Sequence, residues 1–220
     1  MTGRWCTGQW QGVHMALLEV RALTRRFGER IVLDAIDFDI EAGRIAALVG
    51  PNGSGKSTLL RCVAGADRAD DGEVRLNGRI LDETHPDIRE AVAVGLDDID
   101  FFADLSVAEH LELLSFAHGG RDRDGVDRVI TEFGLEPARD QLPATLSSGQ
   151  RRRLALASCF VRPRRLVILD EPEQRLDTVG LSRLTTRLLR EKEAGVAVLM
   201  ASHDADLVAA VADERIEMGE

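Results

Sequence analysis

Three separate runs of apolar residues constrain the fold of this chain most strongly. They are Ile45–Val49, Leu166–Leu169 and Val196–Met200. None of them alternates apolar with polar residues, and short continuous apolar runs are typical of strands buried on both faces of a parallel sheet. Helical patterns occur between and after them, at Lys56–Ala64, Arg151–Phe160 and Leu181–Lys192. This alternation predicts an α/β fold, with a mainly parallel sheet covered by helices on both faces.

The other segments predict two additions to this core. Short strand patterns occur at Leu17–Val20, Ile31–Leu33, Ile36–Ile40 and Glu73–Leu76. They favour an antiparallel β subdomain near the N-terminus. The middle third, roughly Leu96–Leu142, instead has helical patterns, and Ser106 followed by Glu109 forms a capping box for a helix that starts there. We therefore expect a helical subdomain inserted into the core at about residues 96–150.

The chain length fits one large domain. We expect this domain to span residues 15–220, with its core formed by 15–95 and 151–220. Residues 1–14 form an expected disordered extension, and Met15 is a possible true start because patterned sequence begins directly after it. We expect no added regulatory domain after Ile216.

Composition narrows the classes of function and the compartment. The formal net charge of −10 argues against binding to duplex nucleic acid, although it also fits a surface that is simply soluble. Cys6, Cys62 and Cys159 are scattered, which suits a reducing compartment and indicates neither a disulfide framework nor a metal site. No window approaches the roughly 18 apolar residues of a membrane span, and residues 1–14 lack the apolar stretch of a secretory signal. These observations predict a cytoplasmic location.

A glycine-rich loop follows the first apolar run. Gly50-Pro51-Asn52-Gly53-Ser54-Gly55-Lys56-Ser57 fits G-x-x-x-x-G-K-[ST] between a predicted strand and a predicted helix. Glycines allow a tight curl that aims backbone N–H groups at a triphosphate, and the helix N-terminus adds donors and a favourable dipole. Lys56 would contact the β- and γ-phosphates and Ser57 would bind Mg²⁺. The expected nucleotide contacts are Gly50, Pro51, Asn52, Gly53, Ser54, Gly55, Lys56, Ser57 and Thr58.

Two carboxylates end the second apolar run. Asp170 and Glu171 directly follow Leu169, an arrangement of the Walker B type. Asp170 would hold Mg²⁺, usually through water, and Glu171 would polarise the attacking water beside the γ-phosphate. Taken alone, the pair could equally be a capped strand end.

A third motif identifies a family. Leu146-Ser147-Ser148-Gly149-Gln150 precedes the basic run 151–153 and lies between the two motifs above. It resembles the LSGGQ signature of the ATP-binding cassette (ABC) ATPases, with Ser148 in place of a glycine. A serine-led helix N-terminus can bind an anion. The resemblance implies that Ser147, Gly149 and Gln150 contact the γ-phosphate bound to an opposite subunit.

Further landmarks of this family follow in order, and the resemblance extends from about Leu17 onward. Phe27 lies where the family places an aromatic side chain that stacks on adenine. Leu176-Asp177 matches the end of the D-loop, which crosses the dimer interface. His203 lies in a segment similar to the family's switch histidine, which would bond the γ-phosphate and orient Glu171. The expected catalytic residues are Lys56, Glu171 and His203.

The sequence departs from the family pattern in two places. The family usually carries a glutamine at the junction with the helical subdomain, and Asp97 occupies that position here. We hypothesise that Asp97 approaches Mg²⁺, and the alternative is an exposed acidic loop. Glu173-Gln174-Arg175 is also bulkier and more charged than the small residues common in the D-loop, which affects the expected dimer interface.

The resemblance implies an ATP-hydrolysing subunit of an ABC transporter that binds ATP and Mg²⁺. Two copies, or this chain and a related subunit, would dimerise head to tail and drive a separate membrane permease from the inner face of the membrane. The short single-domain form favours an exporter. Two alternatives stay open: an ABC ATPase acting on DNA or ribosomes, and a non-hydrolysing subunit of a heterodimer. The acidic balance and single cassette disfavour the first, and Glu171 and His203 disfavour the second.

Overall fold

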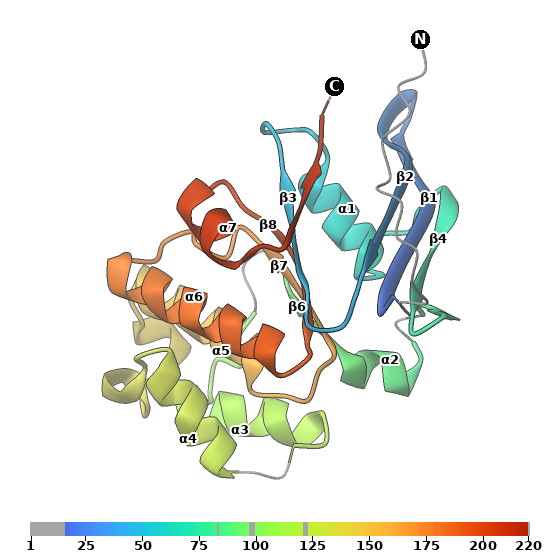
Figure 1. Ribbon diagram of the computed structural model, residues 1–220. Coiled ribbons are helices and arrows are strands. Elements are labelled where there is room, and N and C mark those ends of the chain that lie inside the picture. The colour runs from blue at the N-terminus through green and yellow to red at the C-terminus, as the bar shows by residue number, and fades with distance from the viewer. Residues whose placement is uncertain (1–15, 83, 97–99, 121–122, 220) are drawn as a thin grey trace.

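A five-stranded parallel sheet forms the centre of the computed structural model, which describes residues 16–219 except 83, 97–99 and 121–122 (Figure 1). Its strand order is β6-β7-β8-β3-β9. The strands are β3 (Ile45–Val49), β6 (Val92–Gly95), β7 (Leu166–Asp170), β8 (Ala197–Ala201) and β9 (Glu214–Glu217). The three apolar runs are thus confirmed as the central strands, whereas the two edge strands β6 and β9 were not predicted.

The central strands are buried on both faces, as their sequences indicate. In β3, Ile45 and Ala47 belong to one hydrophobic core, and Ala46 and Leu48 belong to a second core on the opposite face. β7 and β8 divide their side chains in the same alternating way. Successive side chains of a strand point to opposite faces, so a strand between two cores needs an apolar residue at every position.

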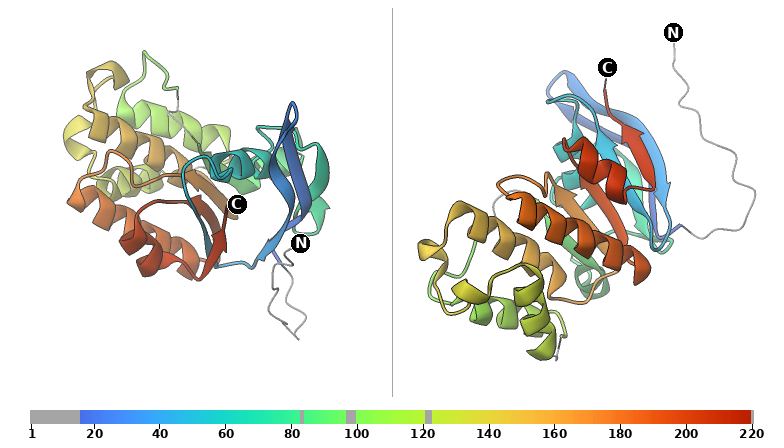
Figure 2. Two further views of the ribbon diagram at one scale, coloured as in Figure 1. Left: turned by 90° about the horizontal axis from the view of Figure 1, so that it is seen from above. Right: turned by 60° about the vertical axis from the view of Figure 1, so that its left-hand side comes forward.

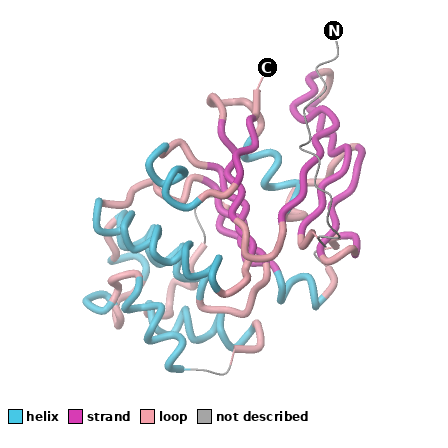
Figure 3. Tube along the Cα trace, viewed as in Figure 1, coloured by secondary structure: helices cyan, strands magenta, loops and turns pink. Residues whose placement is uncertain are grey.

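An antiparallel sheet and helix α1 (Lys56–Val63) cover the face that carries Ala46 and Leu48. The order of this sheet is β2-β1-β4-β5. Its strands are β1 (Leu18–Phe27), β2 (Arg30–Ile40), β4 (Asp71–Leu76) and β5 (Arg79–Ile80). Helix α1 packs into the core shared by the two sheets, which Figure 3 shows as separate groups of strands. The two short strands expected at 31–40 form one strand, β2, which is irregular at Ala35, where φ is +47°.

Helices cover the other face (Figure 2). They are α3 (Val107–Ala117), α4 (Arg123–Glu132), α5 (Ser148–Phe160), α6 (Thr178–Glu193) and α7 (Ala205–Val211). A shorter helix, α2 (Pro86–Ala91), precedes β6, and two single-turn 3₁₀ helices lie at Glu136–Ala138 and Pro143–Thr145. The capping box of Ser106 and Glu109 is confirmed at the start of α3. Among the described residues, no helix has the length and apolar character needed to cross a bilayer.

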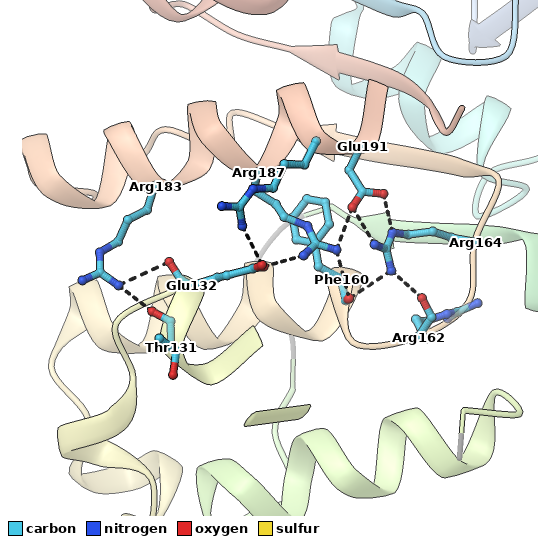
Figure 4. A network of polar contacts seen from close by, with 9 residues as sticks. Thr131, Glu132, Phe160, Arg162, Arg164, Arg183, Arg187 and Glu191 are labelled. Atoms are coloured by element: carbon cyan, nitrogen blue, oxygen red, sulfur yellow. Dashed lines mark hydrogen bonds and ion pairs between the residues drawn. The ribbon is translucent and has the colours of Figure 1, made fainter. Parts of the chain in front are cut away.

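Buried ions join α4 of the helical subdomain to α6 of the core (Figure 4). Arg187 pairs with Glu132 and, at 2.7 Å, with Glu191. Nε and Nη2 of Arg164 donate to the two carboxylate oxygens of Glu191 at 2.7 and 2.6 Å. The ring of Phe160 lies 5.4 and 5.0 Å from the guanidinium carbons of Arg164 and Arg187. Glu191 therefore neutralises Arg164 and Arg187, and Arg187 also pairs with Glu132 and so joins α6 to α4.

The Glu191→Ala variant should lose about 3 kcal/mol of unfolding free energy, because Arg164 loses its carboxylate partner and Arg187 keeps only Glu132. The side chains of Glu191, Arg164 and Arg187 are only 3%, 11% and 13% exposed. Urea unfolding followed by circular dichroism measures the change. The exposed Glu193 provides a matched control, because Glu193→Ala should change stability by less than about 0.5 kcal/mol. Equal stabilities of the two variants would show that the buried pairing contributes little.

Candidate nucleotide-binding site

The phosphate loop (residues 50–57) connects the end of β3 to the start of α1. At its first residue, Gly50, φ is +149°, and a Cβ atom would lie 2.0 Å from the carbonyl oxygen of Met218. Only glycine fits there. Met218 directly follows β9, and its N–H donates to the carbonyl of Val49 at 2.7 Å. The start of the loop is therefore fixed between β3 and the residue after β9.

Lys56 is folded against the loop that carries it. It is the first residue of α1, and it is only 6% exposed. Its Nζ donates to the carbonyl oxygens of Gly50 at 2.8 Å and Pro51 at 2.9 Å. An ammonium group has three N–H donors, so Lys56 can hold the loop in shape and still donate to an anion. The N-terminus of α1 adds backbone donors at the same place.

The phosphate loop lines a cleft of about 270 Å³. The cleft collects residues from β2, from the loop and α1, and from the segments that follow β7 and β8. Its lining residues are Arg30, Val32, Asn52, Gly53, Gly55, Lys56, Ser57, Thr58, Glu171 and His203. All except Arg30 and Val32 are sequence-predicted site residues. Those two come from the antiparallel sheet, and no motif marks them.

Glu171 and His203 meet within this cleft. Glu171 directly follows β7 and His203 lies two residues after the neighbouring strand β8, and the carboxyl ends of parallel strands lie at one edge of a sheet. The Nε2 atom of His203 is 3.2 Å from Oε1 of Glu171. Glu171 has a φ of +43°, which is an uncommon conformation for a residue with a side chain. Its N–H donates to the carbonyl of Ala201 at 2.9 Å, so the strained turn is held by the neighbouring strand.

Arg152 is a residue of this region that the sequence analysis missed. Its Nη2 atom donates to the backbone carbonyls of Asp170 at 3.0 Å and Glu171 at 2.7 Å. The helix that begins at the signature segment (residues 146–150) thereby supports the backbone of the acidic pair. The basic run 151–153 was visible in the sequence, but only the packing of α5 against β7 shows which arginine makes this contact.

Oxygen donors suited to a hard cation lie at this edge of the sheet. Ser57 is exposed in the cleft, and the partly buried Asp170 ends β7 beside Glu171. Among the described residues, no group of three or more histidine, cysteine, aspartate or glutamate side chains could hold a metal by itself. A hydroxyl and a carboxylate fit Mg²⁺, which takes one or two protein oxygens together with substrate phosphates and water. Asp97, the third predicted ligand, lies outside the described residues.

Phe27 ends β1 and is 50% exposed. The guanidinium carbon of Arg25 lies 4.6 Å from the centroid of its ring, a cation–π contact. Phe27 is not among the described residues that line the cleft. Its stacking on adenine therefore stays a prediction, and one face of the ring already carries Arg25.

The signature segment and the D-loop residue Asp177 cap helices. The hydroxyl of Ser147 accepts from the N–H of Gln150 at 3.2 Å, and Oε1 of Gln150 accepts from the N–H of Ser147 at 2.9 Å. The sequence predicted that this helix begins at Arg151. The capping box explains why α5 begins three residues earlier, at Ser148. Asp177 accepts from the N–H of Gly180 at 2.7 Å. Neither these residues nor Gly149 line the cleft of their own chain, as far as its described residues show.

Comparisons with known proteins identify the family of the chain. The family model for the ABC transporter matches residues 33–174. The spermidine/putrescine import ATP-binding protein PotA of Pseudomonas aeruginosa is 35% identical over 193 residues, which are 86% of this chain and 53% of that protein. The Fe(3+) ions import ATP-binding protein FbpC of Streptomyces avermitilis is 39% identical over 211 residues, which are 92% of this chain and 59% of that protein. The chain thus spans little more than half of these relatives' lengths.

A solved structure of an ATP-binding subunit of an ABC transporter superimposes with a TM-score of 0.83 at 27% sequence identity, covering 92% of this chain and 85% of that one. The predicted fold, a parallel sheet with an antiparallel sheet and inserted helices, is therefore confirmed. The family model includes the phosphate loop, the signature segment and the acidic pair. On the motifs, the fold and the sequence relatives together, the chain belongs to the ABC transporter family of ATP-binding proteins.

Proposed function

We propose that this chain binds and hydrolyses ATP as a subunit of an ABC transporter. The observation that carries the proposal is the cleft that brings Lys56 and Ser57 together with Glu171 and His203. These residues come from three separate strand ends and supply the cationic, hydroxyl, carboxylate and imidazole groups that phosphoryl transfer to water requires.

The phosphate loop binds the β- and γ-phosphates through backbone N–H groups and Lys56. The Asn52–Gly55 turn and Thr58 lie around the same phosphates, and Phe27 stacks on the adenine. Ser57 and Asp170 would hold Mg²⁺, which would supply positive charge next to the phosphate oxygens. In this role the contacts of Lys56 with Gly50 and Pro51 keep the loop in its binding shape before ATP arrives.

Hydrolysis uses the carboxylate beside the γ-phosphate. Glu171 orients the attacking water and accepts its proton as the water oxygen bonds to the γ-phosphorus, while the bond from that phosphorus to the β–γ bridging oxygen breaks and ADP leaves. His203 lies 3.2 Å from the Glu171 carboxylate and holds it in place. The 28% exposed fraction of the Glu171 side chain leaves the carboxylate within reach of water.

A second subunit completes the site. The tip of α5, with Ser147, Gly149 and Gln150, lies outside the cleft of its own chain, so in the proposed assembly it faces the γ-phosphate held by a partner copy or a related subunit. Asp177, in the loop before α6, lies at the same dimer contact. The pair works from the inner face of the membrane through a permease. We propose import as the direction, because both relatives described above are named as import proteins. The expectation of export finds no support among them.

Mixing two inactive variants tests this arrangement. Lys56→Ala removes the phosphate contact, and Gly149→Glu places a negative charge at the tip of α5. The backbone at Gly149 accepts a side chain, because φ is not positive and the nearest atom to its Cβ would be the Arg175 carbonyl oxygen at 3.4 Å. Each variant alone should hydrolyse little ATP. An equal mixture should recover about a quarter of wild-type activity, because half of the random dimers are mixed and each has one intact site.

Phosphate release with Mg²⁺ present, and with EDTA as a blank, measures the outcome. If a site were complete within one chain, Gly149→Glu alone would keep wild-type turnover, and the proposed assembly would be wrong.

A further inference from the structure

One carboxylate outside the expected catalytic group bonds directly to the switch segment (residues 201–204). Oε1 of Glu173 accepts a hydrogen bond from the hydroxyl of Ser202 at 2.8 Å and another from the backbone N–H of His203 at 2.8 Å. Glu173 lies in the loop between β7 and α6, two residues after Glu171. No motif discussed above gives Glu173 a role, and its size and charge distinguish this loop from the small residues common at its position.

These two bonds fix the backbone at His203. Ser202 is buried, at 3% exposure, and its hydroxyl also accepts from the N–H of Asp204 at 3.1 Å. Asp204 in turn caps α7 by accepting from the N–H of Leu207 at 2.8 Å. The segment is therefore held by Glu173 on one side and by the start of α7 on the other, although the His203 side chain itself is 41% exposed.

The two carboxylates that contact His203, those of Glu171 and Glu173, come from one turn. Glu171 meets the imidazole at 3.2 Å, and Glu173 binds the backbone of the same histidine. The turn is itself fixed, because Arg152 donates to the carbonyl of Glu171, and that carbonyl also accepts from the N–H of Gln174 at 3.0 Å. A half-exposed ring held only at its tip would change rotamer readily, whereas a fixed backbone limits the positions that the ring can reach.

We propose that Glu173 is a positioning residue, which keeps the His203 imidazole at the Glu171 carboxylate by holding the backbone of the switch segment. The inference rests on the hydrolytic function proposed above. A carboxylate suits this task because it accepts two charge-assisted hydrogen bonds on a single oxygen. It also ties the loop between β7 and α6 to the switch segment, so that displacement of the loop displaces the histidine.

Kinetics with three variants test the proposal. Glu173→Ala should lower kcat about tenfold to hundredfold, the effect of losing a hydrogen bond to a charged group at a catalytic position, and should change the Kd for ATP less than about twofold. Glu173→Gln keeps an acceptor oxygen and should recover part of the activity. Glu193→Gln removes an exposed carboxylate elsewhere and should match the wild type. If Glu173→Ala lowered kcat, ATP affinity and the thermal midpoint together, Glu173 would have a merely structural role, and the proposal would be wrong.

A measurement without nucleotide separates this proposal from the function it rests on. In Glu173→Ala, the backbone amide of His203 should exchange hydrogen at least about tenfold faster, and its imidazole NMR resonances should shift as they do in Glu171→Gln. Unchanged imidazole resonances would overturn the positioning role whether or not the chain hydrolyses ATP. If the wild-type chain released no phosphate while these changes occurred, the proposed hydrolysis would fail and the contact of Glu173 with His203 would stand.

Discussion

The Glu171→Gln variant should hydrolyse ATP about 10²- to 10⁴-fold more slowly than the wild-type chain, which is the usual effect of removing a general base. Glutamine keeps the size of the side chain and an oxygen that can face the Nε2 atom of His203, 3.2 Å away in the wild type. ATP binding should therefore survive while proton transfer is lost. Phosphate release gives the rate, and equilibrium binding of ATP gives the affinity.

The same variant should accumulate as a dimer when ATP is added. In the proposed assembly, ATP that persists between the phosphate loop of one copy and the α5 tip of another would hold both copies together, and hydrolysis would no longer release them. Small-angle scattering with ATP and with ADP distinguishes the two states, and Glu193→Gln is the matched control because Glu193 is exposed at the end of α6. A monomer with bound ATP, or turnover close to that of the wild type, would contradict the proposed mechanism.

The Lys56→Ala variant should bind ATP roughly 30-fold to several thousand-fold more weakly, which corresponds to the about 2–5 kcal/mol lost when one partner of a buried charge pair is truncated. Two effects combine here. The phosphates lose a cation, and the loop loses the bonds from Nζ to the carbonyls of Gly50 and Pro51 at 2.8 and 2.9 Å. Titration calorimetry with Mg-ATP measures the affinity.

The control for this change uses the other lysine of the chain, Lys192, which pairs with Asp213. Lys192→Ala should leave ATP affinity unaltered, because neither partner lines the cleft. Lys56→Met is a second test, since it retains the buried aliphatic stem and removes only the charge and its hydrogen bonds. If a folded Lys56→Met protein bound Mg-ATP with near wild-type affinity, the phosphate loop would not be the proposed binding site.

The sequence predicts best those parts of the fold in which burial produces a simple pattern. β7 and β8 lie in the middle of the sheet and are apolar at every position except Asp170, which ends β7, so their runs stand out. β9 is an edge strand with the sequence Glu-Arg-Ile-Glu and three exposed residues, and it carries no such pattern. β6 has only four residues. Their place in the sheet depends on neighbours that are distant in the sequence.

The residues of the candidate site also divide into those that the sequence predicts and those that it does not. The phosphate loop is predictable because its residues are consecutive and each is required by local geometry, as the close approach of Gly50 to Met218 illustrates. Arg152 and Glu173 act on backbone groups of other elements, and those contacts follow from how α5 packs and how β7 and β8 align. Their sequence signals, a basic run and an unusual acidic residue, indicate that something differs there but not what it touches.

The position of β3 has a consequence for how the protein is made. β3 leads directly into the phosphate loop, yet it pairs with β8 and β9, which follow on the order of 150 residues later in the chain. A ribosome therefore delivers the loop long before the strands that shape it, and the carbonyl of Met218 that limits Gly50 emerges later still. The loop can therefore take the shape described here only after β8, β9 and Met218 have all been synthesised.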